Sequence, residues 1–184
     1  IDEALESLVG SERCPDEVIV VDDGSTEASS RSALEAWSDR SGLPFDFAVH
    51  RTANHGLATA RRHGLARARG EYIVFLDADD AVAPSYLGLL AAALDRHPEA
   101  GAVTTWYEYF GEAEGYWTPL TAQFPLFLME NCAGAGAMAR RTAVEEAGGP
   151  RPWLRYNLED WEMWVSMASK GWAILTLPQP LFRY

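Results

Sequence analysis

The chain of 184 residues is poor in positive charge, with 15 Lys and Arg against 27 Asp and Glu and a formal net charge of −12. Lysine is nearly absent, because Lys170 is the only one. So acidic a chain does not favour a nucleic-acid backbone or an anionic membrane surface as its main partner. A binding site for phosphate groups must therefore be made locally, by a metal ion or by a few arginines.

Cysteine and histidine patterns that bind metals are also missing. The two cysteines, Cys14 and Cys132, form no CxxC motif, and no two of the four histidines are spaced i,i+4. Two scattered cysteines indicate a reducing, cytoplasmic environment. No segment reaches the ~18 apolar residues of a membrane-spanning helix, so membrane association is not visible in the sequence.

Apolar runs alternate with helical patterns along the first hundred residues. The expected strands cover 17–23, 45–51 and 72–76, and the expected helices cover 27–40, 55–69 and 84–97. Strands that are apolar on both faces belong to parallel sheets covered by helices. The alternation predicts an α/β fold with a Rossmann-like, mostly parallel sheet flanked by helices.

The second half of the chain has a less regular pattern. Its expected elements are a strand at 102–110, a short helix at 142–147, a helix at 158–170 and a strand at 172–177. The stretch 111–136 is rich in glycine, proline and aromatic residues and has no clear period. No linker or repeat divides the chain, so we expect a single domain over 1–184.

Acidic residues follow two of the expected strands at the point where each strand ends. Asp22 and Asp23 follow "VIVV", and Asp77, Asp79 and Asp80 follow "YIVFL". In an open α/β sheet ligands bind beyond the carboxyl ends of the strands, so both clusters should open onto one crevice. Acids also cap loops and helices routinely, and for either cluster alone that interpretation is nearly as good. Carboxylates this close repel one another unless a cation is present, which favours a cation site at 77–80.

The helix at 55–69 carries one cation on its apolar side. Arg61 lies near the centre of a stripe formed by small and apolar residues, namely Leu57, Ala60, Gly64, Leu65 and Ala68. An arginine that faces the sheet needs a partner. That partner is either a bound ligand or one of the nearby acids in a structural salt bridge, and the residues alone leave both open.

Five segments of the chain match, in order, the motifs of one enzyme family. They are "EVIVVDDGST" (17–26), "NHGLATAR" (54–61), "ARGEYIVFLDADD" (68–80), "GAMARRTAVEEAGG" (136–149) and "EDWEMW" (159–164). These segments resemble the family 2 glycosyltransferases, which have the GT-A fold. The resemblance implies a nucleotide-sugar-binding half at 1–100 and an acceptor-binding, catalytic half at 101–184.

The resemblance assigns roles on the donor side. Asp23 matches the acid that hydrogen-bonds the nucleotide base, Asp22 stands beside it, and Arg61 matches an arginine lining the nucleotide pocket. Asp77 and Asp79 match the DxD pair, which handles the ribose and a divalent metal on the donor diphosphate, with Asp79 the expected direct ligand. Carboxylate oxygens suit Mn²⁺ or Mg²⁺, and either ion can neutralise a nucleoside diphosphate leaving group. The expected donor is a UDP-sugar.

On the acceptor side, Asp160 matches the catalytic base of the ED motif. A carboxylate within hydrogen-bond reach can take the proton of the attacking acceptor hydroxyl, and direct displacement inverts the anomeric centre. By position alone, an acid in the first turn of a helix that Asn157 could cap serves equally as a helix-dipole partner. The acceptor-binding candidates are Glu159, Trp161 and Trp153.

Two departures from the family pattern add expectations. Family members begin with a strand, whereas "IDEALESL" matches only the helix that follows it, so we expect a piece of a longer protein whose first strand precedes Ile1. The Q-x-x-R-W motif of processive synthases is replaced by "QPLFRY", so the transfer of single sugars is expected.

Two other classes of protein are compatible with parts of the sequence. One is a glycosyltransferase-like module that binds nucleotides without turnover. The other is a receiver-type phosphoacceptor domain, because "VIVVDDGS" resembles its acidic pocket. A receiver needs a lysine at the end of a strand, whereas Lys170 ends an expected helix.

Overall fold

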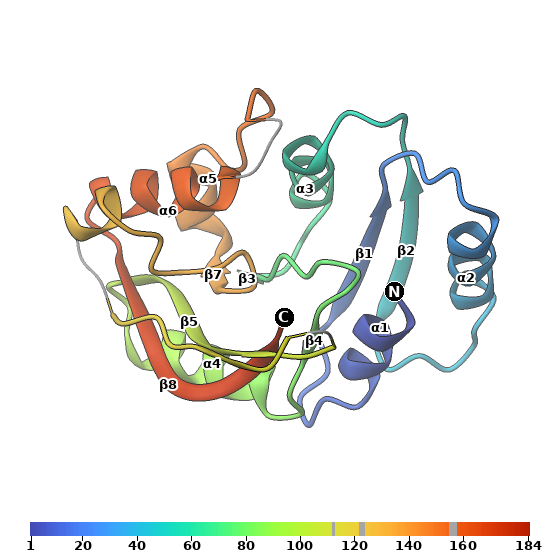
Figure 1. Cartoon of the computed structure of the whole chain (residues 1–184), viewed down its shortest axis with the longest axis horizontal. Helices are drawn as coiled ribbons and strands as arrows, with labels where there is room; N and C mark the ends of the chain where they lie inside the picture. The colour runs from blue at the N-terminus through green and yellow to red at the C-terminus, as the bar shows by residue number, and fades with distance from the viewer. Residues whose placement is uncertain (112, 122–123, 155–157) are drawn as a thin grey trace.

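The structure, a computed structural model, describes residues 1–111, 113–121, 124–154 and 158–184. The helices are α1 (Asp2–Val9), α2 (Ala28–Ser38), α3 (Leu57–Leu65), α4 (Tyr86–Arg96), the 3-10 helix η1 (Leu126–Leu128), α5 (Arg141–Ala147) and α6 (Glu159–Ser169). The strands are β1 (Glu17–Asp22), β2 (Asp46–Arg51), β3 (Tyr72–Ile73), β4 (Ala81–Val82), β5 (Ala100–Tyr109), β6 (Gly115–Trp117), β7 (Met138–Arg140) and β8 (Ala173–Arg183). The predicted α/β class is confirmed (Figure 1).

The described strands form two sheets. β1 pairs with β2 in parallel, and the larger sheet has the order β3-β7-β5-β8-β4 with β6 also paired to β5. Within the larger sheet only β5 and β8 run parallel, whereas the other described pairs are antiparallel. The expected mostly parallel sheet is therefore corrected to a mixed one. Of the antiparallel pairs, only β5 and β6 follow one another directly among the described strands, whereas β3 with β7, β5 with β7 and β4 with β8 are joined by longer stretches of chain.

Helices cover both faces of the larger sheet (Figure 1). Successive residues of a strand point to opposite faces, and β5 shows this clearly. Ala102 belongs to a core formed with α5 and α6, where Trp164 is fully buried. Val103 belongs to a second core formed with α4, around Tyr86 and Phe182. The larger sheet thus separates the two cores, with α5 and α6 packed on one face and α4 on the other.

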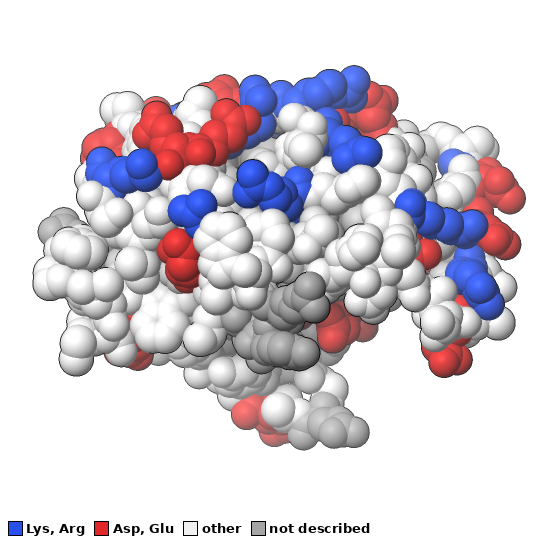
Figure 2. All heavy atoms as spheres, turned by 90° about the horizontal axis from the view of Figure 1, so that it is seen from above, with Lys and Arg blue, Asp and Glu red and all other residues white. Residues whose placement is uncertain are grey.

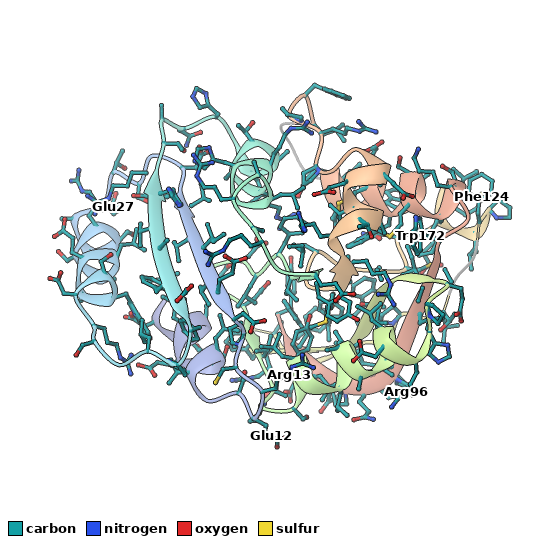
Figure 3. All side chains as sticks on the ribbon, turned by 180° about the vertical axis from the view of Figure 1, so that it is seen from behind. Glu12, Arg13, Glu27, Arg96, Phe124 and Trp172 are labelled. Carbon is teal, nitrogen blue, oxygen red and sulfur yellow. The ribbon has the colours of Figure 1, made fainter. Side chains whose placement is uncertain are left out.

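The expected strand at 72–76 is formed only at Tyr72–Ile73. A cavity of about 750 Å³ separates residues 74–77 from β1, and apolar side chains of both segments line it. Arg13, in the loop before β1, lines the cavity far from α3 (Figure 3), and Asp77 lines it near α3. A strand requires a hydrogen-bonding neighbour, so residues 74–77 form no ladder across this gap.

We expect an apolar strand that occupies this cavity, between β1 and residues 74–77, to stabilise the protein. Each buried aliphatic side chain contributes ~1.5–3 kcal/mol, so several should raise the thermal unfolding midpoint by more than ~10 °C. The measurement compares the chain extended before Ile1 by a short Val- and Ile-rich segment with one carrying an equally long Gly/Ser extension. Equal midpoints would show that the cavity does not take up an added strand.

Candidate active site

Asp22, the last residue of β1, is buried and shapes the turn that follows. Its Oδ1 accepts a hydrogen bond of 2.8 Å from the Ser25 N–H, and its Oδ2 lies 3.8 Å from Arg51 Nε. Burial acts to raise the pKa of Asp22, but the Ser25 N–H and the nearby arginines outweigh it and lower the pKa below its usual value. Asp22 therefore stays ionised and holds the loop; a direct contact with a nucleotide stays a prediction.

Asp23 holds the loop that leads into α3. Its carboxylate accepts hydrogen bonds from Thr52 Oγ1 at 3.0 Å, from the His55 N–H at 3.0 Å and from the Gly56 N–H at 2.7 Å. Gly56 has a φ of 89°, a conformation that favours glycine, and this turn lets both N–H groups point at one carboxylate. A nucleotide base that donates a hydrogen bond to Asp23, as predicted, must therefore share a carboxylate that already accepts from these partners.

Arg61 lies at the centre of the site and joins two acids. Its Nη2 donates to both oxygens of Asp77, at 2.7 and 2.9 Å, and its Nη1 donates to Glu159 Oε1. The Arg61 side chain is 9% exposed, and its Nε is buried without a partner in the described part of the chain. The salt bridge that the sequence left open is thus present. Contact between Arg61 and a nucleotide stays a prediction.

Asp79 and Asp77 differ in their freedom to bind a metal. Asp79 is exposed, whereas both carboxylate oxygens of Asp77 accept hydrogen bonds from Arg61. Among the described residues, no three Asp, Glu, His or Cys side chains gather to form a complete metal site. Mg²⁺ is typically held by one or two carboxylates together with substrate phosphates, so Asp79 fits that mode of binding. The residues present therefore suit a metal that arrives with a diphosphate.

Asp80 is 6% exposed and lies next to the other two acids. Burial, and then the charges of Asp77 and Asp79, raise the pKa of Asp80 from an ordinary value of 3.8 to about 7. The folded protein therefore binds a proton at Asp80 more tightly than the unfolded chain does. This contribution to stability is complete below pH 3.8 and is lost as the pH rises to about 7.

In metal-free protein, Asp80→Asn should remove this pH dependence. Between pH 4 and 7, the wild type should lose on the order of 2–4 kcal/mol of unfolding free energy through this carboxyl group. The loss of unfolding free energy in the variant over the same range should be smaller by that amount. Urea unfolding at a series of pH values measures the difference. Asp39→Asn, at an exposed acid that follows α2, is the control and should follow the wild-type curve. Parallel curves for Asp80→Asn and wild type would contradict the expectation.

Asp160 lies in the first turn of α6 with its carboxylate oriented by two donors. Its Oδ1 accepts the Trp161 N–H at 2.7 Å, and its Oδ2 lies 3.5 Å from Asn131 Nδ2. The Asn131 Oδ1 accepts the Ala133 N–H at 3.3 Å, which fixes the direction of the amide. Asn131 was not predicted, because it stands in a segment without periodicity. Asn157, the predicted cap, lies outside the described residues.

The three acceptor-side candidates lie in different environments. Glu159 is 3% exposed and contacts Arg61. Trp161 donates its indole N–H to the Phe127 carbonyl at 2.5 Å, which ties α6 to η1. Trp153 is 72% exposed, with the Arg151 guanidinium 5.6 Å from its ring. Trp153 is the one of the three that is freely accessible, and all three acceptor roles stay predictions.

The face of the molecule drawn in Figure 2 carries charges of both signs. Basic and carboxylate side chains both lie on it, with uncharged surface between them. Lys170 follows the last residue of α6, so it does not supply the strand-end lysine of a receiver domain.

None of the described helices is long and apolar enough to span a membrane.

Comparison with known proteins gives consistent results. The model of the family "Glycosyl transferase family 2" matches residues 1–148. The amylovoran biosynthesis glycosyltransferase AmsE of Erwinia amylovora is 25% identical over 189 residues, covering 100% of this chain and 69% of AmsE. Glycosyltransferase GlyA of Streptococcus pneumoniae is 32% identical over 111 residues, covering 60% of this chain and 15% of GlyA. The chain spans about two thirds or less of the length of the curated relatives that it matches.

Solved structures share the fold. S. aureus TarS 1–349 in complex with UDP superposes with a TM-score of 0.81 at 19% identity, covering 100% of this chain and 56% of TarS 1–349. GalNAc-T7 with UDP, GalNAc and Mn²⁺ gives 0.78 at 18% identity, covering 98% of this chain and 40% of that protein. The expected GT-A fold is confirmed.

Proposed function

Because the chain belongs to glycosyl transferase family 2, we propose that it transfers one sugar from a nucleoside-diphosphate sugar to an acceptor hydroxyl, with inversion and without processivity. The observation that carries the proposal is the position of Arg61, whose guanidinium contacts both Asp77 and Glu159. The acids after β3 and the acids that begin α6 therefore share one site. The proposed donor is a UDP-sugar, since TarS binds UDP.

On the donor side, residues 1–100 are proposed to bind the nucleotide sugar. Asp23 and Arg61 border the nucleotide, and Asp77 and Asp79 face the ribose and the diphosphate. Asp79, with Asp77, would hold Mn²⁺ or Mg²⁺, and the bound ion would neutralise the leaving diphosphate. The protein itself supplies the orientation, because the Asp23 contacts fix the loop in front of α3.

On the acceptor side, Asp160 takes the proton of the acceptor hydroxyl as that oxygen attacks the anomeric carbon. The Trp161 N–H and Asn131 orient the Asp160 carboxylate for this step. Trp153 and Trp161 are the aromatic surfaces proposed to contact the acceptor. We place this half of the reaction in residues 101–184.

We also propose that the protein is cytoplasmic, because Cys14 and Cys132 are free cysteines rather than members of a disulfide.

Calorimetric titration with UDP, GDP, dTDP and CDP, each with and without Mn²⁺, tests the donor site in the full-length protein. Metal-dependent binding of one nucleotide is expected and would identify the base. Release of that nucleoside diphosphate from its sugar conjugate, with acceptor present, then tests turnover. Binding without turnover across a panel of acceptors would favour the alternative, a nucleotide-binding module.

A further inference from the structure

We infer that Glu159 is a positioning residue that acts through Arg61. By contacting Arg61, it fixes the start of α6, and with it Asp160, relative to Asp77 on the donor side of the site. The inference rests on the proposed function, because Asp160 is the proposed base. It replaces a direct contact between Glu159 and the acceptor with an indirect role.

The contacts of Arg61 form a buried bridge between three separate segments. Arg61 belongs to α3, Asp77 follows β3, and Glu159 is the first residue of α6. The side chains of Arg61 and Glu159 are 9% and 4% exposed, so water screens their attraction little. A guanidinium holds two carboxylates in a fixed planar arrangement, which an ammonium cannot do. The bridge therefore sets both the distance and the orientation between the two acidic segments.

The backbone at the start of α6 needs such a support. Leu158, the residue before Glu159, has a φ of 69°, in the left-handed region that non-glycine residues seldom adopt. A strained conformation persists only where surrounding contacts hold it. The described contacts at this point include the Glu162 N–H on the Leu158 carbonyl at 2.9 Å, those of Asp160 with Asn131 and the Trp161 N–H, and the ion pair of Glu162 with Arg151. The contact of Glu159 with Arg61 is the ionic one that reaches α3 and the donor side of the site.

A direct acceptor contact fits the geometry less well. The Glu159 side chain is almost fully covered, and its Oε1 already accepts from Arg61 Nη1. Removing its charge would leave the buried Arg61 with Asp77 as its one remaining ionic partner among the described residues, which is costly for a buried cation. The predicted consequence is a displaced Asp160 rather than weaker binding of the acceptor. A displacement of ~1 Å can lower a rate by a factor of ~10².

The test is Glu159→Gln in the full-length protein, with Glu162→Gln as the matched control. Glu162 lies in the same first turn of α6 and pairs with Arg151 at 3.2 Å, away from Arg61. We expect Glu159→Gln to lower kcat by a factor of about 10 or more, with the nucleotide Kd and the acceptor KM within about threefold of wild type. Hydrogen exchange of the amides of 159–162, among which the Trp161 and Glu162 N–H groups have described acceptors, should be faster in this variant. Glu162→Gln should leave kcat within about twofold.

Two results would overturn the inference. One is a folded Glu159→Gln with wild-type kcat and wild-type exchange. The other is a raised acceptor KM with unchanged kcat, which would indicate direct contact with the acceptor. If Glu159→Gln does not fold, Arg61→Lys keeps the charge but cannot make both contacts, and the same fall in kcat and faster exchange are expected.

Failure of the proposed function is distinguishable from failure of this inference. A wild-type protein that transfers no sugar from any donor would contradict the proposed function. The exchange of amides 159–162 needs no turnover, so it still reports whether Glu159 holds the start of α6. Unchanged exchange in both Glu159→Gln and Arg61→Lys would then refute the bridge itself.

Discussion

Asp160→Asn is expected to lower kcat by a factor of ~10² or more while the nucleotide Kd stays unchanged. Asparagine has the shape of aspartate and can still accept the Trp161 N–H through its Oδ1, so the start of α6 should keep its structure. It cannot take a proton from the acceptor hydroxyl. Steady-state transfer with saturating donor and acceptor gives kcat, and calorimetry with the nucleoside diphosphate gives Kd.

Glu162→Gln is the control, because it removes a carboxylate from the same helix without touching Asp160. A folded Asp160→Asn variant with normal turnover would remove Asp160 from the mechanism.

Asp79→Asn is expected to abolish most of the gain in nucleotide affinity that Mn²⁺ provides. Asp79 is exposed, while Asp77 is engaged with Arg61, so Asp79 is the carboxylate with oxygens free for a cation. An amide offers one neutral oxygen in place of a charged pair, and hard cations prefer carboxylates. The ratio of Kd without and with Mn²⁺ should fall at least ~10-fold, to near unity.

Two variants make this result specific. Asp39→Asn removes an exposed acid after α2 and should keep the full effect of Mn²⁺. Asp77→Asn should disturb metal-dependent binding too, but it also releases Arg61, so faster exchange of amides 159–162 should accompany it. The assignment of Asp79 as a metal ligand would be contradicted if Mn²⁺ raised the nucleotide affinity of Asp79→Asn as much as it raises that of the wild type.

Much of the fold could be predicted from local patterns. The apolar runs at 17–23 and 45–51 became β1 and β2, and the helices at 27–40 and 84–97 became α2 and α4 with slightly shorter bounds. The run at 72–76 failed as a strand because strand formation depends on a neighbour. Periodicity reports which residues are apolar, and it carries no information on whether a partner strand lies alongside.

The candidate site was predictable in its residue types and less so in its contacts. The helical stripe placed Arg61 toward the sheet, and the structure supplies the acid that the sequence could not choose, Asp77, together with Glu159 from the other half of the chain. Contacts between segments so distant in sequence depend on tertiary packing. Asn131 was missed for the same reason, since only the position of η1 and α6 brings it to Asp160.

The separation of β1 from residues 74–77 has a consequence for handling the protein. The side of β1 that faces the cavity presents backbone N–H and C=O groups without a described strand beside it, along an apolar run. Exposed edges of this kind recruit strands from other molecules and lead to aggregation. Any preparation that leaves this edge uncovered should therefore become less soluble as its concentration rises, and covering the edge should restore a monodisperse protein.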